Sequence, residues 1–239
     1  MSQPLRILVV GGGGQGAKGA LAAGALSAMG HRAVVFDDWN FGFSRYGRAT
    51  NGLRWLAATY PAALRALVPW TSRRFVVAAR RFRPDVVLAI RADRISRAAL
   101  ERAKREARAR AVNWISDNVF RLPALLASLL VFDRVFVKDS FVLEELLRRG
   151  YSHVRYLGQC CEPALHRTVA LTPAEARYYG SDLALVGAMY PRRLAVAETL
   201  TDFDMKVWLD HPRLRLPARS PVRAKIVSHR AHGIEQTRV

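Results

Sequence analysis

Short apolar runs alternate with longer amphipathic segments from Leu5 to Tyr156. Each run of about four to six residues is almost continuously hydrophobic, which is typical of parallel strands covered by helices on both faces. The expected strands are Leu5 to Val10, Ala33 to Phe36, Asp85 to Ile90, Ala111 to Ile115, Arg134 to Val137 and His153 to Tyr156. The expected helices are Gly16 to Met29, Gly52 to Val68, Ser72 to Phe82, Ser96 to Arg108, Leu122 to Leu130 and Ser140 to Arg149. The pattern predicts an α/β fold, a Rossmann-like doubly wound parallel sheet.

A second, shorter series of the same kind follows a proline-containing linker. Its expected elements are a strand at Asp182 to Val186, a helix at Arg192 to Leu200, a strand at Asp204 to Trp208 and a short strand at Ala224 to Val227. Two or three strands cannot bury both faces of a sheet. We therefore expect an N-terminal domain at 1–165, a linker at 166–181, and the beginning of a second Rossmann-like domain at 182–239, left incomplete.

Composition narrows the class of protein. With 239 residues and 51% hydrophobic content, the chain has ample material for a buried core. The longest apolar stretch, Leu122 to Phe132, is about half the roughly 20 residues needed to span a bilayer, and the N-terminus lacks a signal-peptide pattern. We expect a cytoplasmic protein. Cys160 and Cys161 are adjacent and are the only cysteines, so neither a disulfide framework nor a metal site is expected.

The formal net charge is +19 and is carried almost wholly by arginine. Such a charge favours an anionic partner, such as nucleic acid, a membrane surface or a phosphorylated substrate. The densest run, Arg97 to Arg110, is interleaved with Glu101 and Glu106 and is typical of a solvated helix face. A basic binding module therefore stays open as an alternative function. We expect peripheral contact with an anionic membrane surface and no specific nucleic acid, without a residue pattern that locates the contact.

A glycine run follows the first expected strand and opens a helix. Gly11, Gly13 and Gly16 satisfy G-x-G-x-x-G, and Asp37 and Asp38 end the second strand where a dinucleotide domain keeps its ribose carboxylate. An NAD-dependent oxidoreductase is therefore one alternative.

The same glycines admit two further interpretations. Backbone N–H groups at Gly13, Gly14 and Gly16, together with the helix N-terminus, could hold the phosphates of any nucleotide or nucleotide-sugar. The glycines could equally serve the tight turn alone. The residues themselves leave these interpretations open.

Five blocks along the chain carry a family resemblance. They are Arg83 to Ile90 (RPDVVLAI), Val112 to Asn118 (VNWISDN), Phe132 to Lys138 (FDRVFVK), Tyr156 to His166 (YLGQCCEPALH), and Tyr179 to Gly187 (YGSDLALVG) continuing to Arg193. In this order they resemble the bacterial CgeB-like (spore maturation protein) glycosyltransferases of GT-B architecture. The chain departs from the family at Glu162-Pro163, where an Asp-Pro is usual, and this change keeps both charge and turn.

The resemblance implies an N-terminal acceptor domain and a C-terminal donor domain that together move a sugar from a nucleotide-sugar to an acceptor hydroxyl. It implies neither cofactor nor metal, because backbone dipoles and basic side chains stabilise the leaving diphosphate. Gly187 and Arg193 match the glycine and arginine that begin the family's donor domain. Arg193 could hold a phosphate or be a surface charge. The segment 232–239 resembles the approach to the next donor helix, and we expect this chain to be inactive alone because the rest of that domain is missing.

Two acceptor-side residues follow from the same resemblance. Asp117 matches an acidic position and is the candidate general base, if the reaction inverts the sugar's configuration. Its alternative role is the N-cap of the turn into Phe120 to Leu130. Lys138 ends the next strand and could face the acceptor, or it could be a solvent-exposed lysine before a helix cap at Asp139 or Ser140.

Overall fold

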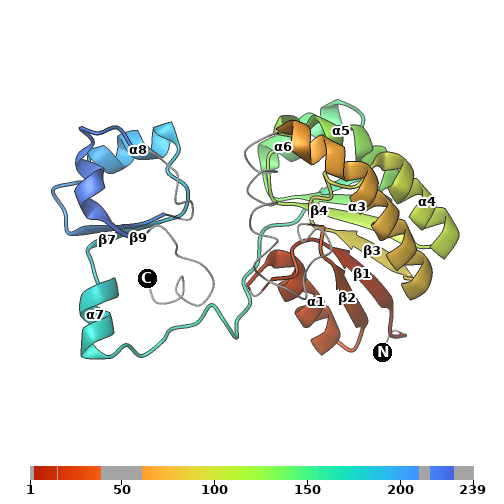
Figure 1. Ribbon diagram of the computed structural model, residues 1–239, viewed down its shortest axis with the longest axis horizontal. Coiled ribbons are helices and arrows are strands. Elements are labelled where there is room, and N and C mark those ends of the chain that lie inside the picture. The colour runs from red at the N-terminus through yellow and green to blue at the C-terminus, as the bar shows by residue number, and fades with distance from the viewer. Residues whose placement is uncertain (1–2, 15, 39–60, 210–215, 229–239) are drawn as a thin grey trace. The chain divides into compact units, whose positions relative to one another are not determined.

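The computed structural model describes residues 3–14, 16–38, 61–209 and 216–228. The chain divides into two compact units, residues 1–160 and 161–239 (Figure 1). The expected linker, 166–181, contains a short helix of its own, α7 (Pro173–Tyr179). Thr172 and Glu175 cap this helix reciprocally, side chain to backbone, which explains why it forms despite having no buried residue.

The first unit is built on a six-stranded sheet in the order β2-β1-β3-β4-β5-β6, and every neighbouring pair is parallel. Its strands are β1 (Arg6–Val10), β2 (Arg32–Phe36), β3 (Val86–Ala89), β4 (Arg110–Ile115), β5 (Arg134–Val137) and β6 (Val154–Tyr156). All six strands expected from the hydrophobic runs are confirmed, with ends shifted by a residue at most. The parallel α/β fold is thus the one that the sequence predicts.

Five helices of this unit are described. They are α1 (Lys18–Ala28), α3 (Pro61–Phe82), α4 (Arg97–Ala107), α5 (Pro123–Ser128) and α6 (Ser140–Arg148). Single 3-10 turns lie at Val119–Arg121, before α5, and at Leu129–Val131, after it. The last turn of the helix expected at Leu122 to Leu130 is therefore of the tighter 3-10 kind.

The prediction of two helices on either side of Pro69 is wrong. The described residues form one helix, α3, that continues through Pro69, while residues 52–60 lie outside the described part of the chain. Phe75 and Ala79, both fully buried, hold the helix against the sheet beyond the proline. The Thr71 hydroxyl donates to the Leu67 carbonyl at 3.0 Å, one turn back. Packing therefore overrides the local helix-breaking tendency of proline.

Both faces of the sheet are covered, which confirms the doubly wound arrangement. Side chains alternate along β1, so that Leu8 and Val10 face one core while Ile7 and Val9 face another. The larger core lies under α3, α4, α5 and α6, and the smaller one lies under α1 through Ala23 (Figure 1).

The second unit contains a three-stranded parallel sheet in the order β7-β8-β9. Its elements are β7 (Leu183–Val186), α8 (Pro191–Glu198), β8 (Met205–Trp208), a 3-10 turn (Pro221–Lys225) and β9 (Ile226–Ser228). Ala197, Val207, Leu209 and Val222 are fully buried between the sheet and these helical turns. The short strand expected at Ala224 to Val227 begins later, because the 3-10 turn takes its first two residues. The segment 232–239 lies outside the described residues.

None of the described helices is both long enough and apolar enough to cross a bilayer.

Candidate functional site

The candidate site is the carboxyl edge of the six-stranded sheet. Parallel strands all end at one edge, where ligands bind in doubly wound folds. The residues that follow the strands here are Gly11 to Gly16 after β1, Asp37 and Asp38 after β2, Arg91 to Arg94 after β3, Ser116 and Asp117 after β4, and Lys138 after β5. Acidic and basic side chains therefore alternate along this edge.

The glycine turn brings α1 unusually close to β1. A Cβ added at Gly19 would lie 2.6 Å from the Gly12 carbonyl oxygen and 2.9 Å from the Gly11 carbonyl carbon. Only a residue without a side chain permits this approach, and sequence reasoning missed Gly19 in favour of the motif glycines. The signal that could have found it is a glycine in the first turn of the helix that follows the run. Gly16 has φ +73°, whereas Gly14 faces open space.

Asp37 and Asp38 differ in their environments. A Cβ added at Gly13 would lie 3.1 Å from Asp37 Oδ2, so the Asp37 carboxylate lies against the glycine turn. Asp38 is 2% exposed, and burial above all raises its pKa to about 7, with Arg94 opposing the rise and Asp93 and Asp37 adding to it. Asp38, one of the two carboxylates expected to bind a ribose, is thus buried away from any ligand. Asp37, the other, lies beside the glycine turn, where the phosphates of a nucleotide are expected.

The turn after β3 has an unusual backbone. Arg91 (φ 83°) and Ala92 (φ 59°) both occupy the left-handed region, which costs about 1–3 kcal/mol for each residue. The Asn113 side chain, fully buried on β4, donates to the Arg91 carbonyl at 3.3 Å, and Ala92 is packed in the core. Such over-determined strain is typical of functional turns.

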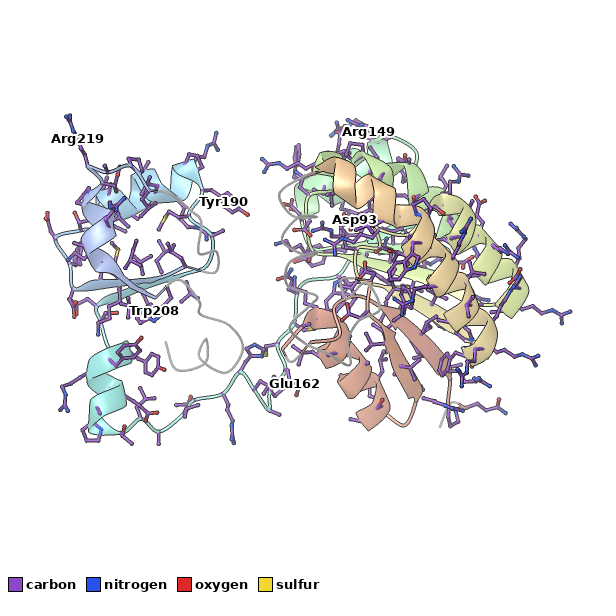
Figure 2. All side chains as sticks on the ribbon, viewed as in Figure 1. Asp93, Arg149, Glu162, Tyr190, Trp208 and Arg219 are labelled. Atoms are coloured by element: carbon purple, nitrogen blue, oxygen red, sulfur yellow. The ribbon has the colours of Figure 1, made fainter. Side chains whose placement is uncertain are left out.

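This turn aims the Arg91 guanidinium at two carboxylates. Its Nε and Nη2 donate to Asp93 Oδ1 and Oδ2 at 2.8 and 3.0 Å, and its Nη1 donates to Asp117 Oδ2 at 3.2 Å. Burial raises the pKa of Asp93, but the bonds and charge of Arg91, helped by Arg94, outweigh it and leave the pKa below the ordinary value. Figure 2 labels Asp93 within this unit. Sequence reasoning missed Arg91, although a polar Arg-Ala-Asp-Arg run directly after a strand is a usable signal.

Asp117 does not cap the following helical turn, so that alternative is wrong. Asn118 caps it instead, because its Oδ1 accepts from the Phe120 amide at 3.0 Å. The Asp117 side chain is half exposed and accepts from Arg91. Its second oxygen, Oδ1, has no hydrogen-bond partner among the described residues.

Lys18 lies near both Asp117 and Lys138. Lys18, in the first turn of α1, donates from Nζ to Ser116 Oγ at 2.9 Å. Its pKa is lowered, first by burial and then by the charges of Lys138 and Arg91, against the opposing pull of Asp117. The structure therefore brings Asp117 and Lys138 close to the start of α1. Lys138 is exposed, and Asp139 caps α6 by accepting from the Phe141 amide at 3.0 Å, which confirms the expected cap.

The second unit places Gly187 and Arg193 together at the end of β7. Gly187 has φ +121°, and a Cβ added there would lie 3.3 Å from Arg193 Nη1. Arg193 donates from Nη1 to the Ala188 carbonyl at 2.6 Å, and its guanidinium lies 5.8 Å from the ring centre of Tyr190, which Figure 2 labels. The arginine is thus folded back over the turn rather than extended into solvent.

The chemistry of the first edge suits a hydroxyl-rich ligand better than a bare anion. The exposed side chains of Lys18, Asp117 and Lys138 can each bond to neutral hydroxyl groups, whereas the carboxylates of this edge repel phosphate. Within the described ranges, no group of three or more His, Cys, Asp or Glu side chains is arranged to hold a metal ion.

No protein-family profile and no curated protein matches the chain. Among solved structures, one similar chain is described as "Crystal structure of Anabaena Alr3699/HepE in complex with UDP and glucose". It is 12% identical, with a TM-score of 0.43, and the alignment covers 86% of this chain and 60% of that chain. The present chain thus spans less than two thirds of that protein.

Proposed function

We propose that this chain belongs to a glycosyltransferase that moves a sugar from a nucleotide-sugar donor to an acceptor hydroxyl. The observation that carries the proposal is the mixed-charge carboxyl edge of the first unit, where Arg91 holds a half-exposed Asp117 and where Lys18 feels the charges of both Asp117 and Lys138. The resemblance of the sequence blocks to CgeB-like glycosyltransferases supports it. The proposal takes the first unit as the acceptor side and the second as the beginning of the donor side.

Asp117 is the proposed general base. Its Oδ1 would accept the proton of the acceptor hydroxyl while the hydroxyl oxygen forms the new bond to the anomeric carbon and the diphosphate leaves. This assignment applies if the reaction inverts configuration. Arg91 acts as a positioning residue, because it fixes Oδ2 and leaves Oδ1 available. Lys18 and Lys138 are proposed to hold acceptor oxygens on either side.

Gly187 and Arg193 are the proposed donor-phosphate contacts. A guanidinium can bond two phosphate oxygens at once, and the fold-back over Gly187 already orders the side chain before any ligand binds. Gly14 and Gly16 remain proposed backbone contacts to a phosphate. At Gly13 the adjacent Asp37 carboxylate favours a ligand hydroxyl instead.

An NAD-dependent oxidoreductase is a less favoured function for this chain. The motif needs a carboxylate that reaches the ribose hydroxyls, and Asp38 is 2% exposed. Asp37 alone would have to serve.

Isothermal titration of the purified chain with UDP, dTDP, GDP and NAD tests the proposal. One nucleoside diphosphate should bind, and Arg193→Gln should weaken its binding about tenfold or more, because a charge-assisted bond is lost. Arg192→Gln is the matched control, since it removes the same charge from the neighbouring exposed position and should leave binding unchanged. Equal effects of the two variants would assign the binding to general charge alone.

Binding of NAD and turnover by the chain alone test different parts of the proposal. Tight NAD binding that is lost in Asp37→Ala would favour the oxidoreductase instead. Turnover of any nucleotide-sugar by this chain alone would contradict the expectation that it is inactive without further donor-domain residues.

A further inference from the structure

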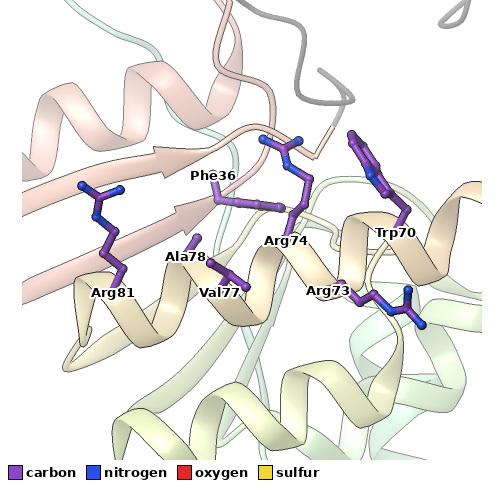
Figure 3. Close-up of a pocket in the computed structure, with 7 residues that line it drawn as sticks. All are labelled: Phe36, Trp70, Arg73, Arg74, Val77, Ala78 and Arg81. Atoms are coloured by element: carbon purple, nitrogen blue, oxygen red, sulfur yellow. The ribbon is translucent and has the colours of Figure 1, made fainter.

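One stripe of α3 faces away from the core and combines arginine with apolar side chains. Five residues lie on one side of the helix, because each is three or four positions from another of them: Trp70, Arg73, Arg74, Val77 and Arg81. The core residues of α3 occupy the other side. Figure 3 shows these side chains projecting from the helix.

The stripe lines a shallow, open groove of about 480 Å³, completed by Ala78 and by Phe36 of the edge strand β2 (Figure 3). Val77 is 61% exposed and Trp70 is 38% exposed, so the groove presents apolar surface to solvent. The Arg74 guanidinium lies 4.8 Å from the ring centre of Trp70, where the two side chains support each other by a cation–π contact. We call the residues lining this groove the α3 patch.

Within the described part of the chain, no carboxylate pairs with the arginines of the α3 patch. The sequence from Pro61 to Arg83 contains no Asp or Glu. Arg80, two helical turns after Arg73, pairs with Glu106 of α4. By contrast, no described carboxylate lies within ion-pair distance of Arg73, Arg74 or Arg81. Three arginines that lack a described carboxylate partner therefore share one surface with two exposed apolar side chains.

We propose that the α3 patch docks on the surface of an anionic phospholipid bilayer. Arginines bond headgroup phosphates while their stems lie along apolar surface, and tryptophan prefers the depth of the membrane interface. An exposed aliphatic side chain such as Val77 gains from contact with acyl chains. Single-stranded nucleic acid instead binds to several aromatic stacking platforms, of which the α3 patch exposes one. The inference does not depend on the proposed glycosyltransferase function.

Co-sedimentation with vesicles tests the docking surface. The chain should bind vesicles of phosphatidylcholine mixed with phosphatidylglycerol and not vesicles of phosphatidylcholine alone. Arg73→Gln combined with Arg74→Gln should lower the partition coefficient by about tenfold or more. Arg177→Gln combined with Arg219→Gln removes the same charge from exposed positions of the second unit and should change it by less than about twofold.

A second variant separates apolar insertion from charge. Val77→Ser keeps every arginine, and it should weaken binding to the mixed vesicles, because Val77 is exposed and contributes nothing to the core. If Arg74→Gln unfolds the chain, Arg73→Gln combined with Arg81→Gln tests the same charge. Circular dichroism reports the folding of each variant.

Three results would overturn the proposal. Equal losses in the α3 patch and control pairs would show a nonspecific basic surface. Displacement of the vesicles by millimolar inorganic phosphate would identify a site for a soluble anion. Binding of single-stranded RNA that depends on Arg73 and Arg74, without vesicle binding, would identify a nucleic-acid surface.

Discussion

Arg91 Nη1 lies 3.2 Å from Asp117 Oδ2, joining the carboxyl ends of β3 and β4. The same guanidinium makes two bonds to Asp93, whose side chain is 20% exposed against 50% for Asp117. The position of Arg91 is therefore set by the more buried Asp93, and Asp117 is held by a single bond at the surface. Asp117 can exchange that partner for a ligand with little loss of stability.

This relationship predicts unequal effects of removing the two carboxylates. Asp117→Ala should lower the free energy of unfolding by less than about 1 kcal/mol, as for exposed ion pairs. Asp93→Ala should cost about 1–3 kcal/mol, because it leaves a half-buried guanidinium short of two bonds. Urea unfolding of both variants provides the measurement. Equal costs would show that the protein uses Asp117 structurally.

Stability should depend on pH through Asp38. Its pKa is raised from 3.8 to about 7, so the folded chain retains a proton that the unfolded chain releases near pH 4. The contribution of this proton to the free energy of unfolding is fully present below pH 4 and is lost as pH rises to about 7. The total loss is at most about 4 kcal/mol.

Asp38→Asn should flatten this slope of unfolding free energy between about pH 4 and 7. The slope is the readout, since the buried Arg94 also loses a charge partner in this variant. Asp202→Asn, an exposed change in the second unit, should retain the slope of the parent chain. An unchanged slope in Asp38→Asn would show that another group is responsible.

Substitution of two glycines of α1 by alanine should change the stability of the chain in opposite directions. Gly19→Ala places a Cβ against backbone atoms that cannot move aside, and we expect a loss of about 1–3 kcal/mol or more. Gly24→Ala meets nothing within 4 Å and should stabilise the helix by about 0.5–1 kcal/mol. Thermal unfolding measures both. A stable Gly19→Ala variant would contradict the close approach of α1 to the glycine turn.

Gly187→Ala should strain the start of the second sheet. At φ +121° a side chain costs about 1–3 kcal/mol, and the added Cβ would press on Arg193. Hydrogen exchange should rise in 183–198 and remain unchanged in the first unit. Gly158→Ala is the control, because its Cβ makes only ordinary contact with the Tyr156 hydroxyl, at 3.6 Å. Unaltered hydrogen exchange in Gly187→Ala would show that the backbone at this position does not require a glycine.

The sequence by itself determined the strands, most helices and the α6 cap. Each depends on neighbours along the chain: a continuous apolar run predicts a buried parallel strand, and Asp139 bonds amides two and three residues ahead. Gly187 and Arg193 were also named before the structure, through the resemblance of the chain to CgeB-like glycosyltransferases. Local pattern was sufficient wherever the interacting groups were close in the sequence.

Tertiary structure alone decided the features that join distant segments. Pro69 remains inside a helix because Phe75 and Ala79 pack on the sheet, and no local rule predicts that packing. Gly19 is required by the approach of α1 to the turn after β1. The bond from Arg91 to Asp117 spans 26 residues of sequence, and it forms because parallel pairing of β3 and β4 brings their ends to one edge. Burial and pairing across the sheet depend on distances in space, and the separation of two residues along the chain does not give the distance between them in the fold.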